Sequence, residues 1–141
     1  MNPTTNQTIN QRINDAAVHG ISASGFDTRP HHCQKWVRQV VQSVAGSQYD
    51  EFWQATARAT ALAFLDDGRF VVPLDHGSLP GDLLYKLNGS GGDGHVGIRV
   101  RGNQVAENAS CHWNSEAEHP DARGYRTLVE FGHYDVVVRL P

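Results

Sequence analysis

The segment PHHCQKWVRQVVQSVAG, residues 30–46, carries the clearest structural pattern in the chain. Its apolar residues recur at intervals of three and four, which places them on one face of an α-helix; they are Cys33, Trp36, Val37, Val40, Val41 and Val44. Pro30 favours a helix start, and Gly46 favours a helix end. The pattern therefore predicts a helix that begins between Pro30 and Cys33, with Cys33 in its first turn.

Helices are predicted before and after this segment, and strands beyond them. Residues 9–20 repeat apolar side chains at helical spacing, and a third helix is predicted to begin at about Asp50 and to end before Gly68. Short β-runs follow at residues 70–72, 83–87, 95–100, 105–110, 125–131 and 134–140. Residues 111–124 are predicted to be an irregular polar segment. This order predicts an α+β fold with N-terminal helices packed on an antiparallel β-sheet.

Length and composition limit the classes of function. The 141 residues fit one domain, predicted to span residues 1–141, and 39% hydrophobic residues are enough for a core. A net charge of -3 gives no overall attraction to nucleic acid or to an anionic membrane. No stretch approaches eighteen consecutive apolar residues, so membrane insertion is not expected either.

Cys33 and His95 are the candidate nucleophile and base. Backbone N–H groups and the helix dipole at the start of a helix favour a thiolate over a thiol, which is how a cysteine becomes nucleophilic. His95 opens a predicted strand directly after a glycine-rich loop, in the run Gly-His-Val-Gly-Ile at residues 94–98. A nucleophilic cysteine needs such a base within reach of its sulfur.

A hairpin predicted around Gly102 and Asn103 supplies a third candidate. A turn centred on these two residues pairs positions whose numbers sum to 205, so His95 faces Ser110 and has Asn108 as its diagonal neighbour. Asn108 is then the predicted orienting partner of His95, in a Cys, His, Asn arrangement. A bulge would shift the register by one residue and bring Glu107 to that position instead.

These residues resemble the NlpC-type and CHAP cysteine hydrolases. The resemblance covers about residues 28–110 and is carried by four pieces: Cys-Gln-Lys-Trp-Val at 33–37, Gly-Asp-Leu-Leu-Tyr at 81–85, Gly-His-Val-Gly-Ile at 94–98 and Asn-Ala-Ser at 108–110. It implies a papain-like fold that cleaves amide bonds of the peptidoglycan peptide stem or crosslink. It also implies that Cys33 is the nucleophile, that His95 is the base, that Asn108 orients it, and that no cofactor or metal is needed.

Within this family the chain looks closest to CHAP domains and to small type VI secretion amidase effectors. His32 and Gln34 stand where NlpC-type members usually have Asp and Ser, and no tyrosine precedes Cys33. The polar N-terminus lacks the apolar core of a signal peptide, so we expect synthesis in the cytoplasm and action in the periplasm or cell wall after delivery by a secretion system or by lysis. A phage endolysin fits equally well. We expect a monomer, with an immunity protein as a conceivable partner.

Two other classes of function compete with the hydrolase. The first is a structural zinc site built from the six His and Cys residues His31, His32, Cys33, Cys111, His112 and His119, although their spacing matches no known zinc finger. The second is a non-catalytic binding module of the same fold. Cys111 is expected to be a small buried residue. A disulfide to Cys33 is not expected, because it would silence the proposed nucleophile.

Overall fold

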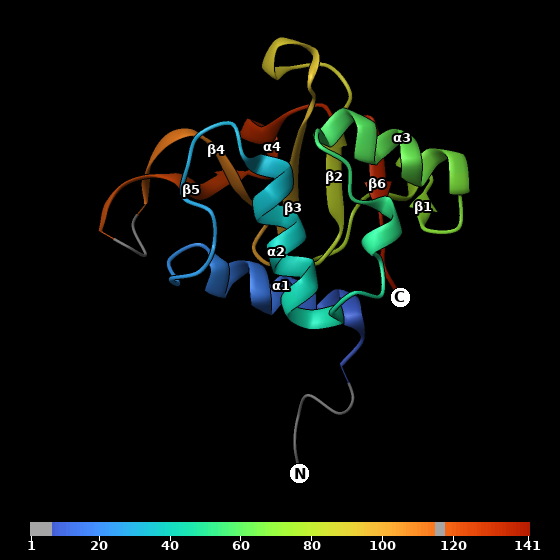
Figure 1. Ribbon diagram of the computed structural model, residues 1–141, viewed down its shortest axis with the longest axis horizontal. Helices are drawn as coiled ribbons and strands as arrows, with labels where there is room; N and C mark the ends of the chain where they lie inside the picture. The colour runs from blue at the N-terminus through green and yellow to red at the C-terminus, as the bar shows by residue number, and fades with distance from the viewer. Residues whose placement is uncertain (1–6, 115–117) are drawn as a thin grey trace.

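A six-stranded antiparallel sheet forms the centre of the molecule (Figure 1). The computed structural model describes residues 7–114 and 118–141, without the side chains of residues 90, 110–114, 119 and 120. The strands lie in the order β1-β6-β2-β3-β4-β5. Their bounds are β1 Val71–Val72, β2 Leu83–Lys86, β3 His95–Val100, β4 Gln104–Asn114, β5 His119–Thr127 and β6 Val136–Val138.

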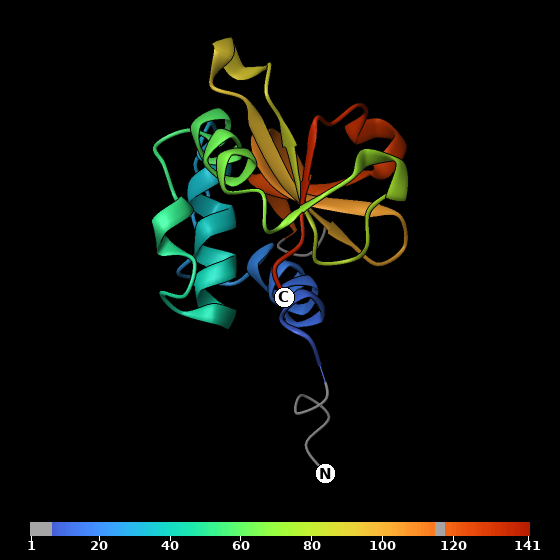
Figure 2. The ribbon, with the colours of Figure 1, turned by 90° about the vertical axis from the view of Figure 1, so that its right-hand side faces the viewer.

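Helices cover both faces of this sheet. Helices α2 (Cys33–Ala45) and α3 (Ala57–Asp67) lie on one side, the short α4 (Leu128–Phe131) lies on the other, and α1 (Ile9–Gly20) packs beside α2 (Figure 2). The larger core lies under α2 and α3 and buries Trp36, Phe64, Tyr85 and Ile98. A smaller cluster under α4 contains Phe131. The predicted α+β class with an antiparallel sheet is confirmed.

The first two helices agree with their sequence patterns. Thr8 caps α1 through a capping box with Gln11. Helix α2 begins at Cys33 and ends before Gly46, whose φ of 58° is a conformation that glycine adopts without strain. The predicted position of Cys33 in the first turn is therefore confirmed.

The predicted start of the third helix is wrong. Asp50 begins a single 3₁₀ turn that ends at Phe52, and the regular helix α3 starts only at Ala57. Thr56 caps it by accepting a hydrogen bond from the backbone N–H of Ala59 at 3.1 Å. The apolar residues before Thr56 matched helical spacing, but the hydroxyl cap sets the true boundary.

The irregular segment predicted at 111–124 is wrong for its described residues, 111–114 and 118–124. Strand β4 continues to Asn114, and β5 begins at His119, so this region belongs to a long hairpin at the sheet edge. Its register is interrupted between Asn108 and His112. The predicted strand over 125–131 is also shorter, because Thr127 and Glu130 form a capping box that starts α4.

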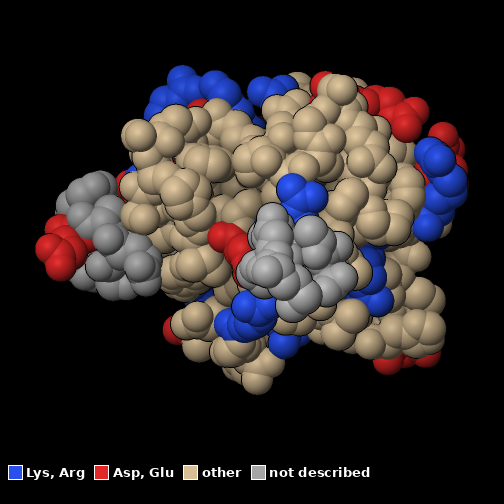
Figure 3. Space-filling view, turned by 90° about the horizontal axis from the view of Figure 1, so that it is seen from below, with Lys and Arg blue, Asp and Glu red and all other residues tan. Residues whose placement is uncertain are grey.

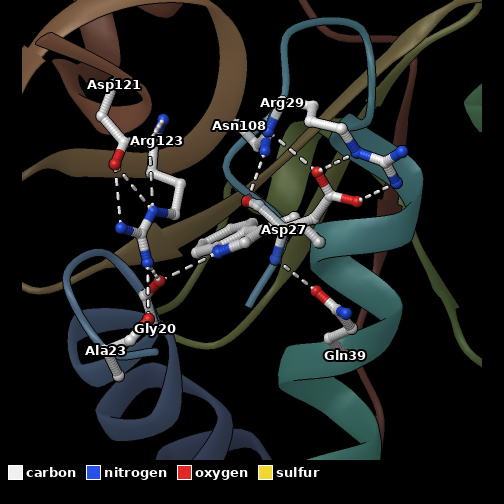
Figure 4. Close-up of polar contacts among 9 residues, drawn as sticks. Gly20, Ala23, Asp27, Arg29, Gln39, Asn108, Asp121 and Arg123 are labelled. Atoms are coloured by element: carbon white, nitrogen blue, oxygen red, sulfur yellow. Dashed lines mark hydrogen bonds and ion pairs between the residues drawn. The ribbon is translucent and has the colours of Figure 1, made fainter. Parts of the chain in front are cut away.

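A buried arginine ties β5 to the loop between α1 and α2 (Figure 4). Arg123 pairs with Asp121 at 2.8 Å, and the side chains of both residues are at most 4% exposed. The Arg123 guanidinium also donates to the carbonyl oxygens of Gly20 and Ala23, at 3.2 and 2.7 Å. The Trp36 indole donates to the same Gly20 oxygen at 3.1 Å. This α1–α2 loop leads directly to Cys33, so its attachment fixes where α2 begins.

Among the described residues, no helix is both long enough and apolar enough to cross a membrane.

We expect Arg123→Met to lower the free energy of unfolding by about 3–5 kcal/mol, because it leaves the buried Asp121 carboxylate and two loop carbonyls without their donor. Chemical denaturation followed by tryptophan fluorescence measures this loss. The matched control is Arg12→Met on the exposed face of α1, which should change stability by less than about 0.5 kcal/mol. Equal effects of the two substitutions would show that the buried network is not important for stability.

Candidate active site

Cys33 lies at the start of α2, on the wall of a cleft. It is a free thiol with 9% of its surface exposed, and the cleft beside it has a volume of about 730 Å³. The N–H groups in the first turn of a helix have no carbonyl partner within that helix. The positive end of the helix dipole therefore lies beside Cys33.

His95 opens β3 on the other wall of this cleft and lies next to Cys33. Its side chain is 11% exposed. Burial alone lowers the pKa of His95, but hydrogen bonds to Cys33 and Glu107 outweigh burial and raise it to about 9. His95 therefore carries a proton at neutral pH. The predicted approach of these two residues is present in the structure.

Glu107 is the residue that orients His95. Its Oε1 lies 2.8 Å from Nε2 of His95, and its side chain is completely buried. Burial raises the pKa of the Glu107 carboxyl, but hydrogen bonds from His95 and Arg126 more than offset this and bring it to about 2. The carboxylate is thus anionic, and Cys33, His95 and Glu107 interact in series.

The predicted register of the hairpin is wrong by one residue. Gly97 pairs with Glu107 and Val100 pairs with Gln104, so paired positions sum to 204 rather than 205. The connection is a three-residue loop, in which Gly102 and Asn103 both have positive φ, instead of a two-residue turn. A shift of one residue moves every side chain of a strand to the opposite face. Glu107 therefore meets His95, which is the alternative that the sequence left open.

Asn108 consequently does not contact His95. It lies on the helix-facing side of β4, is fully buried, and donates a 2.7 Å hydrogen bond to the backbone oxygen of Asp27 (Figure 4). Asp27 belongs to the α1–α2 loop, and its N–H donates to Gln39 of α2 at 2.7 Å. Asn108 thus holds the loop that precedes Cys33 rather than the imidazole of His95.

The Asp27 carboxylate also contacts His32, the residue before Cys33. It accepts three hydrogen bonds from Arg29 and lies 3.2 Å from Nδ1 of His32. Burial raises the pKa of Asp27, but the Arg29 hydrogen bonds and the charge of His32 outweigh it, and the pKa falls to about 2. His31, which directly precedes His32, has a φ of 65°, an uncommon conformation for a residue with a side chain. The approach to Cys33 is therefore closely constrained.

Arg126 completes the site from β5. Its Nε and Nη2 donate to the two oxygens of Glu107, at 2.6 and 2.8 Å. Its guanidinium also lies 5.2 Å from the centre of the Phe131 ring, a cation–π contact. Because both Glu107 oxygens are held by this fork, the carboxylate cannot rotate away from His95. Sequence analysis missed Arg126, since only the pairing of β4 with β5 brings it beside Glu107.

Two glycines make room for this arrangement. A Cβ on Gly97 would lie 2.5 Å from Val105 and 3.1 Å from the ring of Phe131, which packs under His95 with ring centroids 5.7 Å apart. Gly94 has a φ of 77°, and a Cβ there would lie 2.8 Å from the backbone nitrogen of Arg58. Both glycines of the Gly-His-Val-Gly-Ile run are thus required by space around the histidine.

The zinc hypothesis gains no support from the described residues, among which no group of three or more His, Cys, Asp or Glu side chains converges. His32 and Cys33 instead have separate partners, Asp27 and His95. The side chains of Cys111, His112 and His119 lie outside the described part of the structure. The expectations about Cys111 therefore remain predictions.

We expect Glu107→Gln to lower the rate at which iodoacetamide alkylates Cys33 at neutral pH by about tenfold or more, because losing the carboxylate charge destabilises the His95 imidazolium that supports the thiolate. Peptide mass spectrometry separates alkylation of Cys33 from that of Cys111. The comparison variant is Asn108→Ala, which should preserve the pH profile of alkylation while reducing thermal stability. The opposite ranking of the two variants would restore Asn108 as the orienting residue.

The stability of the protein should also report the protonation of His95. Its pKa rises from 6.5 to about 9 on folding, so its contribution to the free energy of unfolding is fully present below about pH 6.5 and is lost as the pH rises through about 9. Urea denaturation of the wild type and of His95→Gln at pH 6 and pH 10 tests this. The stability difference between the two proteins should be larger at pH 6. A difference that grows with pH would mean that His95 is neutral in the folded protein.

Comparison of the chain with protein-family models gives no match, and comparison with curated proteins gives none either.

Proposed function

We propose that this protein is a papain-like cysteine hydrolase that cleaves amide bonds with Cys33, His95 and Glu107. One observation carries the proposal: a free thiol at a helix start interacts with a histidine, which is hydrogen-bonded in turn to a buried carboxylate, and the thiol and the histidine line one cleft. Nucleophilic catalysis uses a nucleophile, a base and an orienting group that interact in this order. In this proposal Glu107 takes the orienting role first expected of Asn108.

The first half of the reaction forms an acyl-enzyme. The Cys33 thiolate attacks the amide carbonyl carbon, and the carbonyl electron pair moves to oxygen to give a tetrahedral oxyanion. When this collapses, the carbon–nitrogen bond breaks and the His95 imidazolium gives its proton to the leaving amine. The pKa of about 9 at His95 suits this role, because the proton is already on the imidazole when substrate arrives.

The second half releases the acid product. Neutral His95 takes a proton from water as the water oxygen attacks the thioester carbonyl. The carbon–sulfur bond then breaks, which returns the thiolate to Cys33 and leaves His95 protonated for the next cycle. Glu107 stays ionised throughout and stabilises the imidazolium at both stages, which is the work of an orienting carboxylate.

The Cys33 backbone N–H is the first donor for the oxyanion. It lies in the first turn of α2, where N–H groups point out of the helix toward developing negative charge. Pre-organised donors of this kind contribute about 3–4 kcal/mol each to stabilising the oxyanion. The close attachment of the α1–α2 loop by Asn108 and Arg123 keeps this N–H in a fixed place.

The proposed substrate is the peptide stem or crosslink of peptidoglycan. Support comes from the resemblance of the four sequence pieces to NlpC-type and CHAP hydrolases, and from the structural need for both glycines beside His95. Action in the periplasm or wall, as a secreted effector or a phage lysin, follows from this substrate. A non-catalytic binding module would not need an ionised acid buried against the base, so the hydrolase is the better account of Glu107.

Digestion of purified peptidoglycan tests the proposal. We expect the wild type to release fragments whose masses identify the amide bond that is cut, and Cys33→Ala and His95→Ala to release none, since removing either member of such a pair typically costs several orders of magnitude in rate. Cys33→Ser serves as the shape-matched control for folding. If the folded wild type released nothing from walls of several chemistries, peptidoglycan would be rejected as its substrate.

A further inference from the structure

The wall of the cleft beside Cys33 is rich in positive charge. Four basic side chains line it, those of Lys35, Arg38, Lys86 and Arg126, whereas the acid among its described lining residues is Asp93. This contrasts with the net charge of -3 on the whole chain. The face of the molecule seen from below carries acidic and basic side chains in scattered positions (Figure 3). The excess of basic residues among the cleft lining is therefore opposite in sign to the net charge of the whole chain.

Buried carboxylates neutralise only part of this charge. Arg126 is paired with Glu107, and Lys35 lies 3.5 Å from Asp27, which Arg29 already neutralises. When Arg29, the two buried carboxylates and Asp135 beside Lys86 are included, five cations face four carboxylates, an excess of one. The proposed thiolate and imidazolium cancel each other. A cleft with this excess attracts anions and raises their local concentration.

Arg38 is the cation of the cleft that is free to bind an anion. It lies on α2 five residues after Cys33 and lines the same cleft, and its side chain has no hydrogen bond or ion pair with any described residue. Its Nε is buried without a protein acceptor, and a buried donor without a partner costs about 1–3 kcal/mol. A carboxylate would satisfy this donor, because the guanidinium fork matches carboxylate geometry.

A second cavity, also of about 730 Å³, shows what a compensated site looks like. It is lined by Arg69, Arg101 and Arg139. Each of these arginines has a carboxylate partner, which is Asp67, Asp15 and Asp82 respectively, at 2.8, 3.6 and 2.7 Å. Arginines at a cavity wall in this protein are otherwise paired, and Arg38 in the cleft is the exception among these cavity arginines.

We propose that the cleft selects anionic acyl substrates, and that Arg38 receives a carboxylate of the substrate near the amide bond that Cys33 attacks. This rests on the proposed hydrolase function and narrows it to substrates with a free carboxylate close to the cleaved bond. An otherwise identical substrate with a carboxamide at that place leaves the Arg38 charge unmatched and binds less well.

The charge of the cleft is measurable without any hydrolysis. Iodoacetate and iodoacetamide react with the same sulfur by the same displacement and differ by one negative charge. We expect the rate constant for iodoacetate divided by that for iodoacetamide to be larger at Cys33 of the folded protein than in the urea-unfolded protein at the same pH. Arg38→Gln should lower this ratio by about threefold or more at low salt, since it removes one cation close to the sulfur.

Arg12→Gln is the matched control, since it makes the same charge change at an exposed position of α1, and it should leave the ratio unchanged. An equal fall in the ratio for both variants would show that net charge, and not the cleft, decides the reactivity. An unchanged ratio in Arg38→Gln would overturn the assignment of Arg38.

Paired peptide substrates then separate this inference from the proposed function. With stem peptides that carry either a carboxylate or a carboxamide beside the cleaved bond, the wild type should show a lower KM for the acid by about tenfold, and Arg38→Gln should abolish that preference. Hydrolysis without such a preference would reject the anionic subsite alone. Absence of hydrolysis together with a high, Arg38-dependent alkylation ratio would reject the peptidase activity and retain the anionic cleft.

Discussion

The Glu107 carboxylate, buried between His95 and Arg126, is the interaction on which the rest of the site depends. An ionised carboxyl can be buried only where charges and donors replace water, and here one histidine and one arginine do so. The proton on His95 is stabilised by this carboxylate and by Cys33 in common. The side chains from Cys33 to Arg126 thus form one continuous series of interactions from the start of α2 to strand β5.

The sheet order explains how this series of interactions is assembled. Strand β3 supplies His95, its neighbour β4 supplies Glu107, and the next strand β5 supplies Arg126. Cys33 comes from α2 on one face of the sheet, while Phe131 of α4 supports His95 from the other. The site therefore lies where both helical layers approach the start of β3, and neither layer could form it alone.

Much of this could be predicted from local sequence. The stripe that begins at Cys33 predicts the helix and its first residue, and the glycine-rich run before His95 predicts a strand that starts at the histidine. These features depend on neighbours within about ten residues. Arg126 and Asp27 could not be predicted in this way, because their partners Glu107 and Asn108 lie 19 and 81 residues away in the chain.

Whether Glu107 or Asn108 lies beside His95 depends on the length of one loop. Gly102 and Asn103 are equally good in a two-residue turn and in the observed three-residue loop that begins at Arg101, so the dipeptide does not decide the register. Burial patterns do not decide it either, since both Glu107 and Asn108 are completely buried polar residues. The sequence could reduce the choice to two neighbours, and only the pairing of β3 with β4 separates them.

This dependence makes the hairpin loop a remote determinant of chemistry. Arg101, Gly102 and Asn103 are exposed and belong to the end of the hairpin far along the strands from His95. Surface loops ordinarily tolerate insertions and deletions. In this protein, closing the same residues with a two-residue turn at Gly102 and Asn103 would shift the register by one and place the Asn108 amide where the Glu107 carboxylate lies, with every residue of the cleft unmutated. When another chain is aligned with this one, the length of the loop between β3 and β4 should therefore be compared as carefully as the positions of the cysteine and the histidine.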